Sequence, residues 1–125
     1  MGRIDVVVGW LLIVFGAAHL SFTRKFDPSL GMNAVWFASG GLLMIAIGAL
    51  NLLRVAYATV AKGVYIVSVI ANVVLMLLML FIAAQVPLRS NPQVIAGLIL
   101  AGLLIALSVL RRSGHAQAHH AQTGK

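Results

Sequence analysis

The sequence has no cysteine and no glutamate, and its acidic residues are two aspartates. Without cysteine the chain cannot form disulfides, thiolate nucleophiles or cysteine metal sites. It also lacks paired carboxylates, a glycine-rich phosphate loop, an HExxH motif and a Ser/His/Asp set suited to nucleophilic catalysis. The sequence therefore offers few side chains that could act as general acids or bases in catalysis. We expect a protein that is not an enzyme, with no catalytic residues.

Charge is scarce as well: 9% of the 125 residues are charged and 62% are hydrophobic, whereas a soluble domain carries about 25% charge. This composition excludes a water-soluble fold. Four stretches without Asp, Glu, Lys or Arg are each long enough to cross a hydrocarbon core of about 30 Å as a helix. The sequence therefore predicts an all-α integral membrane protein with four antiparallel transmembrane helices, at about residues 5–22, 33–53, 63–84 and 93–110.

Turn signals and charges separate these helices. The first connection contains Asp27-Pro28-Ser29 and the third contains Ser90-Asn91-Pro92, and both patterns favour turns. We therefore divide the chain into a four-helix transmembrane domain, residues 1–112, and a disordered basic tail, residues 113–125. Histidines in the tail have i, i+4 spacing, but ordering the chain would oppose metal binding, so we expect no metal site.

The first apolar run also resembles a secretory signal, because Arg3 precedes an apolar stretch that reaches small residues at 16–18. Asp5 cancels the charge of Arg3, however, and the run continues without a break through Phe22. We expect an uncleaved first helix. The alternative is a mature protein of three helices.

Basic residues indicate the orientation of a four-span chain, since the side richer in Lys and Arg stays in the cytoplasm. Five lie on the side of the N-terminus and three on the other. Both termini are expected in the cytoplasm, in a bacterial plasma (inner) membrane. The net charge of +7 sits at the ends of apolar runs, where it suits anionic headgroups, so we expect a lipid bilayer as partner and no nucleic acid. The five are Arg3, Arg54, Lys62, Arg111 and Arg112, and the three are Arg24, Lys25 and Arg89.

Small residues recur at a spacing of seven in the first two predicted helices, which places them on one helix face. Such residues let membrane helices approach closely. We expect them to pack the first helix on the second, or alternatively to form contacts in a homo-oligomer. The helix-packing candidates are Gly9, Gly16, Ala34, Gly41 and Gly48.

His19 is the ionisable residue that falls inside a predicted span, and such groups are functional candidates by default. It lies near the charged end of its helix and has no second histidine in a span to complete a haem or metal pair. We favour an interfacial, hydrogen-bonded histidine. The alternatives are a proton or ligand role in transport and a cofactor role, and we expect no cofactor.

The third predicted helix carries polar and pliable residues at steps of three and four, which form one stripe. Tyr65, Ser68 and Asn72 could line a substrate path, followed by Met76 and Met79 as an adaptable apolar wall. We favour a second interpretation, in which Asn72 forms a hydrogen bond to a neighbouring helix. That bond would contribute about 0.6 to 2 kcal/mol in lipid.

In length and number of spans the chain is similar to the small multidrug resistance exporters, four-helix proteins that work as dimers. That family depends on a membrane-embedded glutamate in its first helix, and this chain has none. The similarity is one of architecture alone.

Two functions remain. We favour a small non-enzymatic membrane interaction or accessory protein that assembles as a homo-oligomer or with another membrane protein, because the spans hold packing residues and little chemistry. The alternative is a small homo-oligomeric transporter or channel for a solute or ion, with His19, Tyr65, Ser68 and Asn72 as its ligand or path residues.

Overall fold

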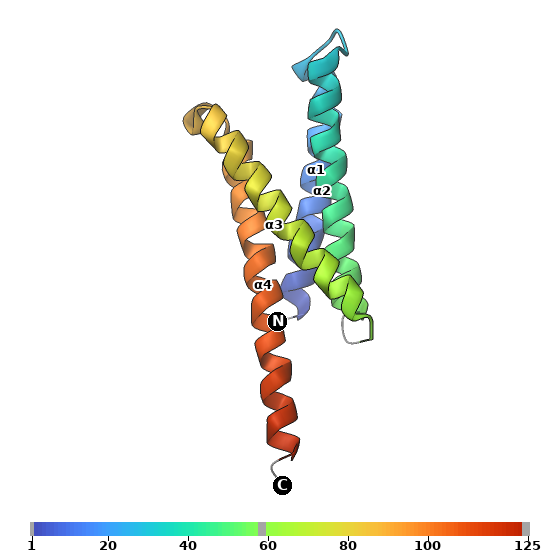
Figure 1. Cartoon of the computed structure of the whole chain (residues 1–125). Coiled ribbons are helices and arrows are strands. Elements are labelled where there is room, and N and C mark those ends of the chain that lie inside the picture. The colour runs from blue at the N-terminus through green and yellow to red at the C-terminus, as the bar shows by residue number, and fades with distance from the viewer. Residues whose placement is uncertain (1, 58–59, 124–125) are drawn as a thin grey trace. The chain divides into compact units, whose positions relative to one another are not determined.

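The computed structural model describes residues 2–57 and 60–123, and the side chains of residues 3–57 and 60–110. The described elements are helical (Figure 1). They are α1 (Gly2–Phe26), α2 (Met32–Tyr57), α3 (Lys62–Gln85), the short 3-10 helix η1 (Leu88–Ser90) and α4 (Pro92–Thr123).

All four α-helices contain a segment long and apolar enough to cross a membrane. The prediction of an all-α chain with four such helices is thereby confirmed. The segments begin or end a few residues beyond the predicted limits, because charged residues such as Arg24 and Arg54 continue the helices past the apolar runs. They are Arg3–Phe26, Met32–Tyr57, Lys62–Gln85 and Pro92–Leu110.

The backbone of α4 continues to Thr123, beyond residue 110 where the apolar run predicts its end. The side chains of the segment from Arg111 onward, with its three histidines, lie outside the described part of the chain. The disorder expected for residues 113–125 stays a prediction.

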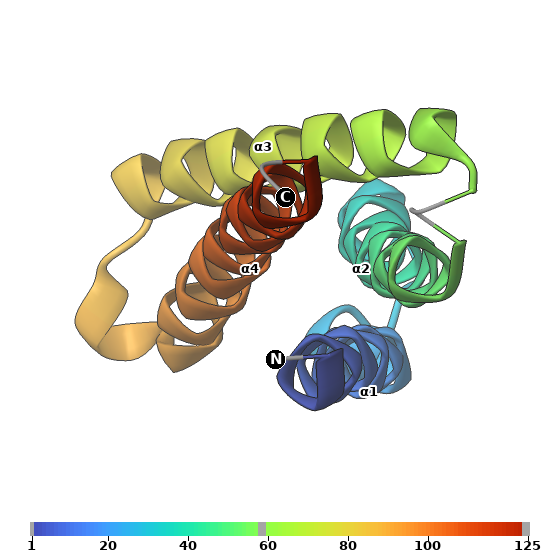
Figure 2. The ribbon, with the colours of Figure 1, turned by 90° about the horizontal axis from the view of Figure 1, so that it is seen from below.

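The chain divides into two compact units within α3: Gly2–Ala71, and the described residues from Asn72 onward. In the first unit, α1 and α2 lie side by side (Figures 1 and 2). Glycines pair across their interface, Gly9 with Gly48 and Gly16 with Gly41. Because low numbers in α1 meet high numbers in α2, these two helices run in opposite directions.

The contact between α1 and α2 is close enough to exclude side chains. A Cβ atom added to Gly16 would lie 2.6 Å from the carbonyl oxygen of Gly41, and one added to Gly41 would lie 2.8 Å from the carbonyl oxygen of Gly16. At Gly48 an added Cβ would lie 2.8 Å from the carbonyl oxygen of Gly9. Backbone meets backbone at these points, which is how small residues bring membrane helices together. Ala34, the fifth packing candidate, is buried near the start of α2.

The turn between α1 and α2 is organised by Asp27. Its carboxylate accepts a hydrogen bond from the backbone N–H of Ser29, at 3.1 Å, and another from the Ser29 hydroxyl. Leu30 takes a left-handed conformation, with φ of 53°, and its N–H donates to the Asp27 carbonyl at 3.1 Å. The hydrogen bond from the Ser29 hydroxyl is the main cause that lowers the pKa of this exposed carboxyl group below its usual range.

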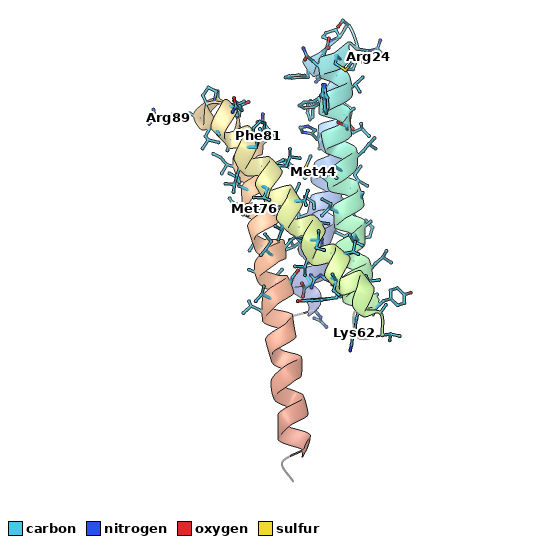
Figure 3. The ribbon with its side chains drawn as sticks, viewed as in Figure 1. Arg24, Met44, Lys62, Met76, Phe81 and Arg89 are labelled. Carbon is cyan, nitrogen blue, oxygen red and sulfur yellow. The ribbon has the colours of Figure 1, made fainter. Side chains whose placement is uncertain are left out.

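In the second unit the later part of α3 packs on α4. A Cβ atom added to Gly97 would lie 2.7 Å from the sulfur of Met79, and one added to Gly102 would lie 3.4 Å from Cε of Met76. The order of these pairs shows that α3 and α4 also run in opposite directions. Figure 3 shows Met76 and Phe81 on α3, with Arg89 at the turn that follows. Flexible methionines thus fill the space that the α4 glycines leave open.

Candidate functional site

The first unit contains a buried ion pair between Asp5 and Arg54. Arg54 Nη2 donates to Asp5 Oδ1 at 2.9 Å, and each side chain is 1% exposed. Asp5 lies in the first turn of α1 and Arg54 in the last turn of α2. Each charge therefore has the sign that the adjacent helix dipole favours.

This pair was not among the sequence predictions. In those, Asp5 is the counter-charge of Arg3, which is exposed in the structure, and Arg54 serves only to infer orientation. A signal was nevertheless present, because Asp5 is one of two acids in an apolar chain. Two antiparallel helices joined by a short turn place the start of the first beside the end of the second, so an acid at residue 5 and a base at residue 54 belong to the same end.

Asn51 extends the ion pair into a network. Its Oδ1 accepts a hydrogen bond from Arg54 Nε at 3.3 Å, and its Nδ2 donates to the carbonyl oxygen of Ile47 at 2.9 Å. Asn51 is fully buried. The Asn51 side-chain amide therefore holds the Arg54 side chain against α2, about one turn before Arg54 itself. We call Asp5, Asn51 and Arg54 the polar network.

One buried nitrogen of the polar network has no hydrogen-bond partner among the described residues. A guanidinium group carries five N–H donors, and Arg54 uses Nη2 and Nε as described. Arg54 Nη1 is buried and has no hydrogen-bond partner among the described residues. An unsatisfied donor on a buried charged group costs more than the roughly 1–3 kcal/mol of a neutral one.

The predicted stripe on α3 divides between the two units. Tyr65 is half-buried and Ser68 fully buried in the first unit. The hydroxyl of Ser68 lies 2.7 Å from the carbonyl oxygen of Val64 and 3.2 Å from that of Leu50, so this side chain connects α3 to α2.

Asn72 belongs to the second unit and is fully buried. Its Nδ2 lies 3.4 Å from the hydroxyl oxygen of Ser108 on α4, to which it donates. The Ser108 hydroxyl in turn donates to the carbonyl oxygen of Leu104 at 2.6 Å. Asn72 thus takes part in the contact between α3 and α4, which is the geometry that the packing interpretation of this residue requires.

His19 lies apart from the polar network. Its ring stacks on Phe37, with centroids 3.7 Å apart and planes at 17°, and Phe37 stacks on Phe26 at 4.6 Å. An added Cβ on Gly40 would lie 3.7 Å from His19 Nε2. His19 therefore faces the first half of α2, whereas Asp5 faces its last turn.

The chemistry available at these positions is hydrogen bonding and charge. Among the residues that the structure describes, no three His, Cys, Asp or Glu side chains come together as metal ligands. The polar network brings three buried polar side chains together in the first unit. Its Arg54 Nη1 and the hydroxyl oxygen of Thr23 are the buried side-chain atoms without a hydrogen-bond partner among the described residues.

Comparison of the chain with protein-family models, with curated proteins and with solved structures finds no match.

Proposed function

We propose that the protein is an integral membrane protein of a bacterial plasma membrane, with four transmembrane helices and both termini in the cytoplasm. The distribution of side chains supports this location. Large apolar residues such as Trp36 and Phe81 are 71% and 66% exposed, whereas Asp5 and Arg54 are buried. Water would disfavour that arrangement and lipid would favour it, because hydrocarbon solvates apolar side chains and forces polar groups to pair internally.

Within the membrane the protein acts as a non-enzymatic interaction or accessory protein. The observation that carries this proposal is the way the described polar side chains are used. The ion pair of Asp5 and Arg54 connects α1 to α2, and the hydrogen bond of Asn72 and Ser108 connects α3 to α4. Because these polar groups hold the helices together, the outer surface is apolar. Such a surface suits binding to a second copy or to another membrane protein.

The test is to extract the tagged protein from its native membrane in a mild detergent and to measure its mass by native mass spectrometry. We expect a defined homo-oligomer or a complex with one other membrane protein at a fixed ratio. Recovery of a monomer with no bound protein, at membrane-like concentration, would contradict the proposal.

A small transporter or channel remains the second candidate. It is favoured by one observation, that Arg54 keeps a buried donor without a partner among the described residues, as a site that receives a polar solute would. In this alternative the candidate path residues are those that the sequence predicts: His19, Tyr65 and Ser68 in the first unit, and Asn72 in the second.

A further inference from the structure

Beyond the proposed function, the geometry around Arg54 points to a ligand. We infer that Arg54 Nη1 binds a phosphate-type oxyanion, supplied either by the headgroup of an anionic phospholipid or by free inorganic phosphate. Three observations carry the inference: the directions in which Arg54 is already bonded, the balance of charge at this end of the unit, and the depth of the site along the helices.

The first observation concerns the guanidinium group itself. Asp5 Oδ1 binds one terminal nitrogen and Asn51 Oδ1 binds Nε, so the buried Nη1 has no partner among the residues that the structure describes. Arg54 is 0% exposed, and a buried charged donor requires an acceptor. The planar guanidinium matches phosphate oxygens in geometry as well as in charge.

The second observation is the balance of charge. In the first unit, Arg3, Arg54 and Lys62 lie at the end where α1 begins and α2 finishes, and Asp5 is the acid among them. Three cations against one acid leave this end positive. The N-termini of α1 and α3 and the C-terminus of α2 lie at this end, so the helix dipoles add to the positive potential of the side chains. A bound anion would reduce the excess, whereas a neutral water would not.

The third observation is position. Arg54 is in the last turn of α2, just past an apolar run, and Figure 3 shows Lys62 at this end of the unit and Arg24 at the opposite end. In a membrane-spanning helix this is the depth of the headgroups, where basic residues attract anionic lipid. A phosphate group is therefore close at hand whether it comes from lipid or from solution, and it reaches the buried Nη1 when the side chains packed around Arg54 move aside.

The experiment compares Arg54→Lys with the wild-type protein in a non-ionic maltoside detergent, which contains no phosphate. Lysine keeps the positive charge beside Asp5 but removes Nη1. One arm adds millimolar inorganic phosphate at constant ionic strength. The other adds phosphatidylglycerol to the detergent micelles. The readout is the shift in Tm, because an anion that binds only the folded state raises Tm with its concentration.

We expect the wild-type Tm to rise in one arm, with phosphate if the source is free anion and with phosphatidylglycerol if the source is lipid. Arg54→Lys should weaken the apparent affinity by about tenfold or more, the value of a charge-assisted hydrogen bond. Arg24→Gln, which removes an exposed cation at the opposite end of the first unit, should change it by less than about threefold.

Two results would overturn the site: no rise in Tm in either arm, or equal responses of Arg54→Lys and the wild type. If Arg54→Lys does not fold, Asp5→Asn decides the question. That variant keeps Nη1 and removes the competing carboxylate, so its Tm should depend on the anion more strongly than the wild-type Tm. A weaker or equal dependence would exclude the oxyanion site.

Discussion

Gly16 and Gly41 meet backbone to backbone across α1 and α2, with room for neither to carry a side chain. Gly16→Ala should therefore force the helices apart, because the new Cβ would lie 2.6 Å from the Gly41 carbonyl oxygen. We expect a loss of about 1–3 kcal/mol in the free energy of unfolding, as for overpacking in a core, and a larger loss for Gly16→Leu. Unfolding by a denaturing detergent measures both.

Gly63→Ala is the matched control for this substitution. Gly63 lies in α3 with nothing within 4 Å of its added Cβ, so the change should be neutral or stabilising by up to about 1 kcal/mol. Leu103→Ile, at an exposed position of α4, should also matter little. Equal effects at Gly16 and Gly63 would contradict the close contact.

Removing one partner of the buried ion pair should lower the free energy of unfolding strongly, whereas replacing both partners by apolar residues should lower it little. Arg54→Met leaves the Asp5 carboxylate buried without its cation, and we expect a loss of about 3–5 kcal/mol in the free energy of unfolding. The double variant Asp5→Leu with Arg54→Met removes both charges and should recover much of that loss. A double-mutant cycle in detergent gives the coupling energy, for which we expect about 3 kcal/mol or more, because each single variant leaves a buried charge unpaired and the double variant leaves none. Strictly additive effects would show that the two residues do not interact.

Asn72→Leu separates the two candidate functions. If Asn72 serves only the contact of α3 with α4, the variant loses one hydrogen bond of about 1 kcal/mol, and assembly should fall slightly or not at all. If Asn72 lines a path, a polar solute would lose its partner where desolvation costs most, and flux into liposomes should collapse while the fold survives. We expect the first outcome.

The transporter would be favoured by the combined result of two variants. Asn72→Leu and His19→Ala would both have to assemble normally and both lose a flux that the wild-type protein shows. Normal flux in either variant would remove that residue from the path.

Topology is tested by fusing reporters to the end of the chain. Five Lys and Arg residues on the side of the N-terminus against three on the other side predict a cytoplasmic residue 125. A reporter that is active only in the cytoplasm should therefore be active there. Activity only of a reporter for the opposite side would revive the alternative of a cleaved first helix.

The Asp27 turn predicts a pH effect whose sign follows from the lowered pKa. The Ser29 hydroxyl stabilises the charged carboxylate, so its contribution is present above the ordinary value of 3.8 and is lost as the pH falls through the lower folded pKa. Ser29→Ala should move the pKa of Asp27 up toward 3.8. An NMR titration of the carboxyl carbon measures this, and an unchanged pKa would exclude the hydroxyl as the main cause.

Much of the fold could be predicted from local sequence. Apolar runs without charge determine where membrane-length helices form, because backbone groups in an apolar segment must satisfy their hydrogen bonds within it. Asp27-Pro28-Ser29 determined the first turn for a reason equally local, since an aspartate carboxylate bonds to the N–H two residues ahead. The seven-residue spacing of Gly9 and Gly16 places both on one helix face, where the structure pairs them with Gly48 and Gly41.

The polar network was decided only by tertiary structure. Asp5 and Arg54 are 49 residues apart, and no periodicity within a single helix relates them. Their meeting depends on how far each helix runs before its turn and on the close approach that the glycines allow. The hydrogen bonding of Arg54 has the same cause. The sequence shows that an arginine ends the apolar run of α2, but the packing of α1 against α2 decides which of its N–H groups find acceptors.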